Sequence, residues 1–154
     1  MKPKLGSLKK GCLIISLFLL VLMLTGCGNK DFAGNNSTSG SSDFRVEDGF
    51  IVLDKEGRIP DNLCEERGLE DKIVVLESKY CGACKVAVPI MKEVEEELGA
   101  DILFLDLSEK ADNLRMNGFR VLPHYTPTML AGCDVYIGVK SKEDYQKIIS
   151  TFLG

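Results

Sequence analysis

Two cysteines separated by only two residues, Cys81 and Cys84, are the residues of this chain best suited to chemistry. The segment 80–85 reads YCGACK; it follows a short β-branched run at 73–76 and precedes a helically spaced run at 86–98. A dithiol between a buried strand and a helix can be oxidised to a disulfide and reduced again. The spacing therefore predicts a chain that transfers electrons through sulfur.

The two cysteines are expected to have different roles. Cys81 would lie in the first turn of the helix, where free backbone N–H groups and the helix dipole stabilise a thiolate and lower its pKa. Cys84 would lie one turn later and face the core, from which it resolves a mixed disulfide by attacking Cys81. We therefore expect Cys81 to be the nucleophile and Cys84 the resolving cysteine, with no metal or organic cofactor. A structural disulfide or half of a zinc site is the alternative for this pair.

The N-terminus has the pattern of a secretion signal. Residues 1–10 carry four lysines and no acid, and residues 12–25 form a 14-residue stretch that is almost wholly apolar. This stretch is shorter than the roughly 20 residues that a membrane-spanning helix needs. Residues 24–27, LTGC, resemble the lipobox of prokaryotic lipoproteins, in which the signal is cut before a cysteine that receives a lipid. We expect a signal at 1–26 and a lipidated Cys27; an ordinary cleaved signal is the alternative.

Charge and composition limit what the rest of the chain can bind. Without the four lysines of the signal, 15 basic residues remain against 23 acidic ones, a net charge of about −8. This balance disfavours binding to nucleic acid or to an anionic membrane surface, so a lipid on Cys27 would hold the protein at the membrane. Residues 27–48 are rich in Gly, Asn and Ser and are expected to form a flexible tether. Residues 49–154 then form one domain.

Strand and helix patterns alternate along this domain in the order βαβαβαββα, which predicts an α/β class. We expect helices that begin at Asp61, after the dithiol, at Ser108 and at Ser141, and that end near Gly68, Gly99 and Gly118. A turn is expected at 55–57 and a loop before residue 126. The expected strands are 50–53, 73–77, 101–107, 128–130 and 135–139.

The whole domain resembles the thioredoxin family. Beyond the cysteine pair, Lys85 follows the second cysteine and Pro89 lies five positions after it, as in thioredoxins. The segment 126–128, TPT, matches the family's cis-proline turn, and 139–143, VKSKE, matches the start of its last helix.

This resemblance implies a thioredoxin fold, a central mixed β-sheet flanked by helices. It also implies a cis peptide bond before Pro127, which proline alone permits at low cost. In the family, the cis-proline packs against the dithiol, and the residue before it offers backbone groups to an extended substrate chain. Tyr80, Thr126 and Pro127 are therefore expected to shape the substrate groove.

Several residues depart from the family's pattern. Tyr80 and Ala83 stand where thioredoxins usually have Trp and Pro, which leaves the reduction potential open. Val75 and Phe104 replace the buried Asp and Lys of cytosolic thioredoxins, so both members of a charged pair are absent together. Glu77, on the same strand face as Val75, is the candidate acceptor for the proton of Cys84, with a pKa raised by burial; a solvated carboxylate is the alternative.

The segment before the proline turn has features of its own. Thr126 is similar to the residue at this position in secreted disulfide isomerases and reductases, which favours a protein disulfide as substrate. Residues 122–125 resemble a small insertion beside the active site. The only histidine, His124, could tune the thiolate near neutral pH, or it could be a surface residue without a role.

Cys64 and Cys133 remain once the other cysteines have been assigned. In an oxidising compartment, two leftover thiols can form a structural disulfide. The sequence does not give the distance between their Cα atoms, so independent free thiols, or a role in electron relay or metal binding, are open alternatives.

Together these features predict a monomeric, lipid-anchored thiol-disulfide oxidoreductase in the cell envelope of a prokaryote. It would reduce or exchange disulfides in proteins, and the resemblance implies a membrane electron donor. An oxidase or isomerase of secreted proteins is the alternative within this class. From a different class, a non-enzymatic carrier could hold copper or zinc through Cys81 and Cys84 together with Cys64, Cys133 or His124.

Overall fold

The computed structural model describes residues 44–154. The expected signal at 1–26, the expected lipidation site Cys27 and residues 28–43 of the expected tether lie outside the described residues. Between residues 44 and 154, every helix is too short or too polar to reach across a bilayer.

A mixed five-stranded sheet forms the centre of the domain, in the order β3–β8–β7–β4–β5. Strand β4 (Ile73–Glu77) pairs in parallel with β5 (Ile102–Asp106) and antiparallel with β7 (Thr128–Ala131). Strand β8 (Asp134–Ile137) follows β7 in a hairpin and pairs at its other edge with the short β3 (Gly57–Arg58). Because β4 has neighbours on both sides, the residues that follow it are anchored to the middle of the sheet.

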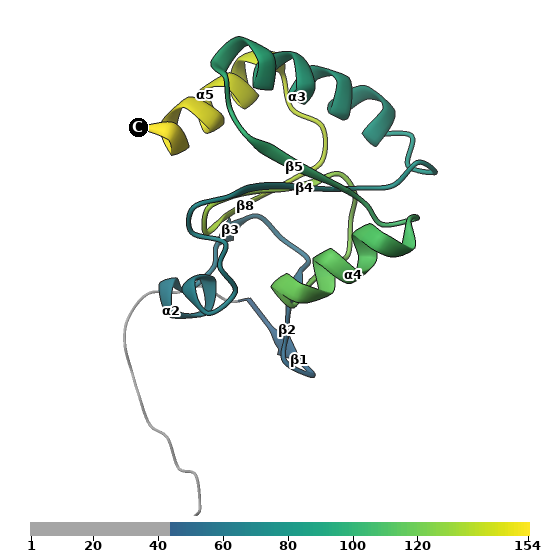
Figure 1. Cartoon of the computed structure of the whole chain (residues 1–154), viewed down its shortest axis with the longest axis vertical. Helices are drawn as coiled ribbons and strands as arrows, with labels where there is room; N and C mark the ends of the chain where they lie inside the picture. Colours follow the sequence, from purple (N-terminus) through teal and green to yellow (C-terminus); the bar gives the residue numbers. More distant parts are fainter. Residues whose placement is uncertain (1–43) are drawn as a thin grey trace, which may run out of the picture. The chain divides into compact units, whose positions relative to one another are not determined.

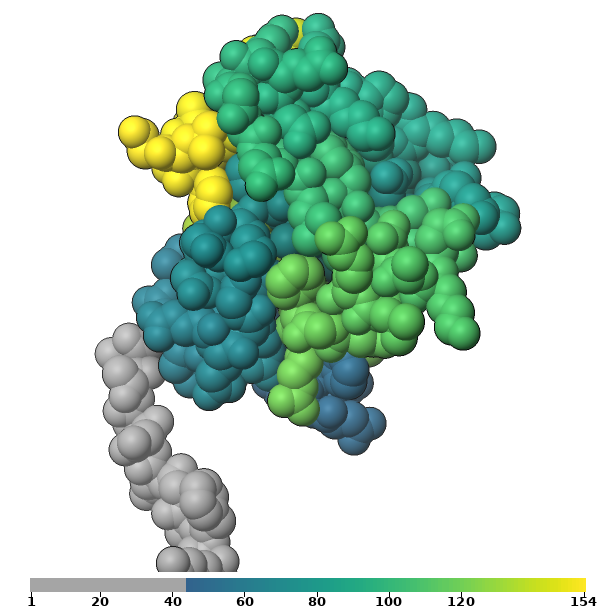
Figure 2. Space-filling view, in the orientation of Figure 1, coloured from purple at the N-terminus to yellow at the C-terminus, as the bar shows by residue number. Residues whose placement is uncertain are grey.

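Helices cover both faces of this sheet (Figure 1). Helices α3 (Cys84–Leu98) and α5 (Lys142–Leu153) lie on one face, whereas α2 (Asp61–Glu65) and α4 (Lys110–Phe119) lie on the other. In the space-filling view, α3, β5 and α4 make up much of the visible surface (Figure 2). The α/β class and the central mixed sheet flanked by helices, as expected from the sequence, are confirmed.

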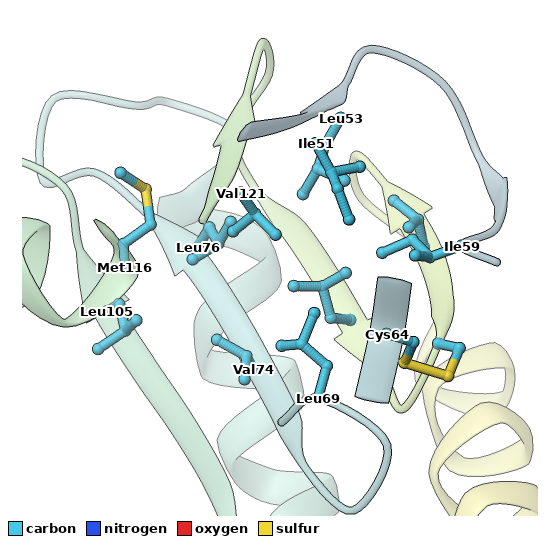
Figure 3. Close-up of a cluster of buried hydrophobic side chains, with 13 residues drawn as sticks. Ile51, Leu53, Ile59, Cys64, Leu69, Val74, Leu76, Leu105, Met116 and Val121 are labelled. Atoms are coloured by element: carbon cyan, nitrogen blue, oxygen red, sulfur yellow. A yellow bond between two sulfur atoms is a disulfide. The ribbon is translucent and has the colours of Figure 1, made fainter. Parts of the chain in front are cut away.

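Strand β4 divides the hydrophobic core into two clusters, because successive side chains of a strand point to opposite faces. Ile73 and Val75 pack under α3 and α5. Val74 and Leu76 pack on the opposite face, in the cluster drawn in Figure 3. Burial on both faces accounts for the uninterrupted apolar run in the sequence of this strand.

The strand predicted at 50–53 forms as β2 (Phe50–Leu53) but does not join the central sheet. It pairs in parallel with β6 (Val121–Pro123), a segment that the sequence assigned to a loop. Ile51 and Val121 lie opposite each other, and both are fully buried in the cluster of Figure 3. The burial of these two side chains explains why a three-residue strand forms in the expected loop.

The end of the expected tether also belongs to the fold. Strand β1 (Val46–Glu47), which lies within the expected tether, pairs antiparallel with β2. Asp48 and Gly49 connect the two strands with positive φ angles of 50° and 82°. Consecutive positive φ angles at Asp-Gly are typical of a tight hairpin turn, which the Gly- and Ser-rich composition upstream obscured.

Gly99 and Ser141 cap their helices as expected, whereas Ser108 and Gly118 do not. The N-cap of α4 is Glu109 instead of Ser108. Gly99 ends α3 with a φ of 61°, and the Ser141 side chain accepts a hydrogen bond from the Asp144 N–H at 3.1 Å at the start of α5. Helix α4, however, continues through Gly118 and ends at Arg120, which takes the left-handed conformation with a φ of 53°. A glycine inside a helix costs only about 1 kcal/mol, so it does not by itself end one.

Candidate active site

The dithiol lies in the loop that joins β4 to α3. This loop turns tightly, because the Cys81 N–H donates to the Ser78 carbonyl oxygen at 2.9 Å. The sequence predicted that Cys81 lies in the first turn of the helix. Helix α3 begins at Cys84 instead, so Cys81 precedes the helix. The expected electrostatic contact nevertheless exists: the Cys84 N–H donates to Cys81 Sγ at 3.0 Å. A free N–H of the helix end thus faces the Cys81 sulfur.

Cys81 is only partly buried, and its thiol is more acidic than an ordinary one. Burial alone would raise the pKa of Cys81. Hydrogen bonds with the side chains of Cys84 and Thr126, and from the backbone N–H groups of Cys84 and Ala83, outweigh burial and bring the pKa below its usual value. A larger share of Cys81 is therefore thiolate near neutral pH, as a nucleophile requires.

Cys84 is the opposite case. Its side chain is 2% exposed and packs with Ala87, Val88 and Met91 of α3 against Val75 of the sheet. Burial, followed by the hydrogen bond with Cys81, raises the pKa of Cys84 to about 11. Both cysteines are free thiols in this structure. A partly exposed sulfur with a lowered pKa and a buried sulfur with a raised pKa thus lie side by side.

The proline turn lies directly against the dithiol. The peptide bond between Thr126 and Pro127 is cis, and Pro127 is buried. The Cys81 Sγ donates to the Thr126 carbonyl oxygen at 3.1 Å. Two segments 45 residues apart in the sequence therefore meet at the Cys81 sulfur.

Two exposed tyrosines flank this meeting point. Tyr80, directly before the nucleophile, is 81% exposed, and Tyr125, directly before Thr126, is 57% exposed. The Lys79 ammonium lies 5.4 Å from the centre of the Tyr80 ring. An exposed aromatic side chain thus precedes each of the two segments that meet at Cys81. Only Tyr80 was identified from the sequence.

His124 belongs to the same surface loop but does not reach the sulfurs. Its backbone N–H donates to the Leu53 carbonyl oxygen at 3.1 Å, and its ring packs edge-on against Tyr125. Within residues 44–154, no hydrogen bond joins the His124 ring to either sulfur of the dithiol. The structure therefore offers no contact through which His124 would tune Cys81.

Glu77 ends β4 on the face that carries Val75. Its side chain is partly buried, and burial, reinforced by the negative charge of Asp106 on the neighbouring strand, raises the pKa of Glu77, although Lys92 acts in the other direction. The direction of this shift agrees with the sequence-based expectation. No hydrogen bond links Glu77 to Cys84 within the described residues, so a proton would have to pass between them through water.

Val75 and Phe104 face each other across the β4–β5 ladder. Val75 is fully buried and Phe104 packs against the same cluster as Cys84. The Lys92 ammonium lies over the Phe104 ring, 5.2 Å from its centre. The floor beneath the dithiol is therefore apolar, which accounts for the high pKa of Cys84.

The other two cysteines of the domain form a disulfide, one of the alternatives left open by the sequence. Cys64 of α2 and Cys133 of the β7–β8 turn are bonded, with Cα atoms 5.6 Å apart. The turn lies at the start of β4, because the Gly132 N–H donates to the Lys72 carbonyl oxygen at 2.9 Å. The dithiol follows the other end of β4, so the two cysteine pairs do not meet.

This separation bears on the metal-carrier alternative. The described part of the chain contains no group of three or more His, Cys, Asp or Glu side chains placed to hold a metal ion. Cys64 and Cys133 are bonded to each other at the far end of β4, and His124 does not contact the dithiol. The ligand set considered from the sequence is therefore not assembled.

Sequence reasoning missed two polar residues that support the site. Thr128 is the only fully buried polar residue among those described, and its hydroxyl donates to the Tyr125 carbonyl oxygen at 2.7 Å. Tyr145 of α5 is 1% exposed and contacts the loop that follows β8 through its hydroxyl. The TPT segment carried a signal for the first of these, since a threonine after a turn can bond back across it. The sequence held no such signal for Tyr145.

Comparisons with known proteins add a distant structural likeness. No protein-family model matches the chain, and no curated protein is similar enough to match. The structure is similar to that of a thiol:disulfide interchange protein, a thioredoxin family protein from Chlorobium tepidum TLS. The match has 20% sequence identity and a TM-score of 0.37, and it covers 58% of this chain and 85% of the other. In its own topology, with the dithiol between the central strand β4 and helix α3 of a mixed, helix-flanked sheet, the chain has a thioredoxin-like α/β fold.

Proposed function

We propose that this protein is a thiol-disulfide oxidoreductase that reduces or exchanges disulfide bonds in proteins through Cys81 and Cys84. The observation that carries the proposal is the difference between the two sulfurs. Cys81 is accessible and has a lowered pKa, whereas Cys84 is buried, has a pKa of about 11 and lies within reach of it. A structural pair would gain nothing from this difference, but thiol-disulfide exchange depends on it.

The exchange proceeds in two steps. The Cys81 thiolate attacks one sulfur of a substrate disulfide, forms a new S–S bond and releases the other substrate sulfur as a thiolate, which takes up a proton from water. Cys84 then loses its proton and attacks Cys81 Sγ, which releases the second substrate sulfur. The substrate has gained two electrons and two protons, and the protein now holds a Cys81–Cys84 disulfide.

Glu77 supports the second step as the acceptor of the Cys84 proton. A carboxylate with a raised pKa holds a proton more readily near neutral pH than an ordinary one. The side chains of the hydrophobic cluster that surrounds Cys84 are apolar, so none of them would take this role. The proton would pass through an intervening water molecule.

An extended segment of the substrate binds in the groove shaped by Tyr80, Thr126 and Pro127. Tyr80 offers a large exposed ring beside the nucleophile, and such rings contribute contact area at low cost in conformational entropy. Thr126 stands directly beside Cys81 Sγ, so a substrate disulfide that reaches the sulfur also meets this turn.

We further propose that the protein works outside the cytoplasm, tethered to the membrane by a lipid on Cys27, and that a membrane donor reduces the Cys81–Cys84 disulfide after each cycle. The lipobox-like LTGC segment and the short apolar run before it support this placement. The Cys64–Cys133 disulfide agrees with it, because such bonds persist in oxidising compartments. Reduction of substrates is the favoured direction, and oxidation or isomerisation of secreted proteins is the alternative.

The test is the reduction potential of the Cys81–Cys84 couple, measured on the full chain in detergent by equilibration with dithiothreitol or glutathione buffers. Peptide-resolved mass spectrometry of alkylated thiols separates this couple from Cys64 and Cys133. A potential near the thioredoxin value of about −270 mV supports a reductase, whereas one near −120 mV makes the protein an oxidant. The absence of a two-electron couple at Cys81 and Cys84 contradicts the proposal.

A further inference from the structure

Helix α5 carries a buried tyrosine whose hydroxyl binds the backbone of the loop that precedes the helix. Tyr145 is 1% exposed. Its hydroxyl donates to the Gly138 carbonyl oxygen at 3.2 Å and accepts a hydrogen bond from the Lys140 N–H at 3.2 Å. Burial raises the pKa of Tyr145, so the hydroxyl keeps the proton that it donates. This buried hydroxyl thus donates one hydrogen bond and accepts another, and both join it to the same loop.

The same loop holds the proline turn. The Gly138 N–H donates to the Pro127 carbonyl oxygen at 2.9 Å. The neighbouring Thr126 carbonyl oxygen accepts a hydrogen bond from Cys81 Sγ at 3.1 Å. A continuous series of contacts therefore runs from the Tyr145 hydroxyl through Gly138 and the proline turn to the sulfur of the nucleophile.

A second buried hydroxyl contacts the turn at its other end, before Thr126. Thr128 is completely buried, and its hydroxyl donates to the Tyr125 carbonyl oxygen at 2.7 Å. This bond closes the turn across Thr126 and Pro127. The turn is thus held by the Thr128 hydroxyl on one side and, through Gly138, by the Tyr145 hydroxyl on the other. Tyr145 and Thr128 lie on different elements, so each anchor can be removed without the other.

We propose that the Tyr145 hydroxyl is a positioning group of the dithiol site, which holds the Thr126 carbonyl oxygen against Cys81 Sγ, with the Thr128 hydroxyl as its counterpart across the turn. The inference rests on the proposed function, because it assigns a role within the same redox site. Tyr145 acts through the loop and the turn rather than by contact with substrate.

The chemistry of the contact gives the effect a sign. A carbonyl oxygen accepts a hydrogen bond from the Cys81 thiol but can give none to the thiolate. Holding the carbonyl at this place therefore stabilises the thiol and moderates the acidity that the Cys84 N–H confers on Cys81. If the carbonyl moves away, Cys81 becomes more acidic, and the reduced form of the couple becomes more stable relative to the disulfide. The Thr126 side chain acts in the other direction, because its hydrogen bond lowers the pKa of Cys81.

The other groups near Cys81 stay in place when Tyr145 changes. Cys84 approaches from α3, and its N–H does not depend on the loop after β8. Glu77 ends β4 and His124 lies before the turn; neither has a hydrogen bond to the Tyr145 hydroxyl within the described residues. Thr126 itself belongs to the turn, and its side chain lowers the pKa of Cys81. The titration of Cys81 therefore reports on how the turn holds Thr126 against the sulfur.

The experiment compares full-length wild type with Tyr145→Phe, which keeps the ring in the core and removes only the hydroxyl. The rate of Cys81 alkylation by iodoacetamide is followed against pH by peptide-resolved mass spectrometry, and the reduction potential of the couple is measured in parallel. We expect the alkylation midpoint to fall by about half a pH unit, as for the loss of one neutral hydrogen bond, and the potential to become less negative.

Thr128→Val tests the second anchor and decides the question if Tyr145→Phe fails to fold. It is expected to shift the midpoint in the same direction, and Thr128→Ser, which keeps the hydroxyl, is expected to restore it. Tyr136→Phe is the matched control, because the Tyr136 side chain on the adjacent strand β8 has no hydrogen bond within the described residues. Its midpoint should equal that of wild type.

An alkylation midpoint that is unchanged or raised in both Tyr145→Phe and Thr128→Val overturns the inference, whatever their stability. This outcome is distinct from failure of the proposed function, which appears in wild type as the absence of a two-electron couple. Because alkylation needs no redox partner, the positioning role is measured even in that case.

Discussion

The two cysteine pairs of this domain lie at opposite ends of the same strand and have opposite properties. Cys81 and Cys84 are three positions apart, unbonded and unequal in exposure and acidity. Cys64 and Cys133 are 69 positions apart, bonded and both buried. What separates a reactive pair from a structural one is therefore the surroundings of each sulfur rather than its presence in a pair.

The surroundings of the sulfurs differ between the two ends of β4. At the dithiol, a helix N–H and a carbonyl oxygen face Cys81, and both contacts depend on the state of the sulfur. At the disulfide, Cys64 is held among the apolar side chains of the cluster in Figure 3. Exchange is favoured where one sulfur reaches solvent with polar neighbours, and disfavoured where both are packed in the core.

The sharpest way to break this comparison is to remove single sulfurs from the dithiol. Cys81→Ser is expected to lower reduction of insulin to the uncatalysed rate, because no other described thiol is accessible. Cys84→Ser is expected to stop turnover as well, but to accumulate a mixed disulfide on Cys81, because the first attack remains possible while resolution does not. Mass spectrometry detects the trapped species, and a trapped substrate in Cys81→Ser would contradict the assignment of the nucleophile.

Removal of the other pair should affect stability instead of activity. The double variant Cys64→Ala, Cys133→Ala frees a loop closed over 69 residues, for which a loss of about 2–4 kcal/mol in the free energy of unfolding is expected. Urea unfolding measures it. At a temperature where the variant is folded, its insulin reduction should match wild type; loss of activity in the folded variant would show that this pair belongs to the redox site.

The acidity of the two dithiol sulfurs can be separated by pH. Cys81 has a lowered pKa and Cys84 a pKa of about 11, so between about pH 7 and 9 the thiolate resides almost wholly on Cys81. Brief treatment of the reduced protein with iodoacetamide should modify Cys81 at least about tenfold faster than Cys84. Peptide mapping reads the ratio, and equal rates would remove the asymmetry on which the proposed function rests.

The smallest effect is expected at Glu77. Glu77→Gln should lower turnover by about tenfold or less and remove the decline in rate as pH falls through the raised pKa of Glu77, because the amide cannot accept a proton. Stability should be kept or increased near neutral pH, since a raised pKa means that the folded state holds the charged carboxylate less well than the unfolded chain does. Glu96→Gln, at an exposed position of α3, is the control for lost charge. An unaltered pH profile in Glu77→Gln would exclude the proton-acceptor role.

Much of the site could be predicted because its signals are local. The Cys81–Cys84 spacing, the apolar run of β4 and the helical spacing of α3 lie in one continuous stretch of about 26 residues, and each acts through neighbours in the chain. The predictions that were wrong concern long-range pairing. Residues 121–123, expected in a loop, form β6 beside β2, because burial against a distant segment outweighed local composition. Residues 46–47 likewise form β1 within the expected tether.

The sequence by itself determined that two thiols stand at the start of a helix, that the second of them faces the core, and that the domain is α/β. These follow from short-range spacing and periodicity. Only the tertiary structure decided that Cys64 and Cys133 form a disulfide. The same holds for the contact of Thr126 with Cys81 and for the hydrogen bond from the Tyr145 hydroxyl to the loop after β8. Each of these contacts joins segments whose distance is set by how the helices and strands pack, and no local pattern records it.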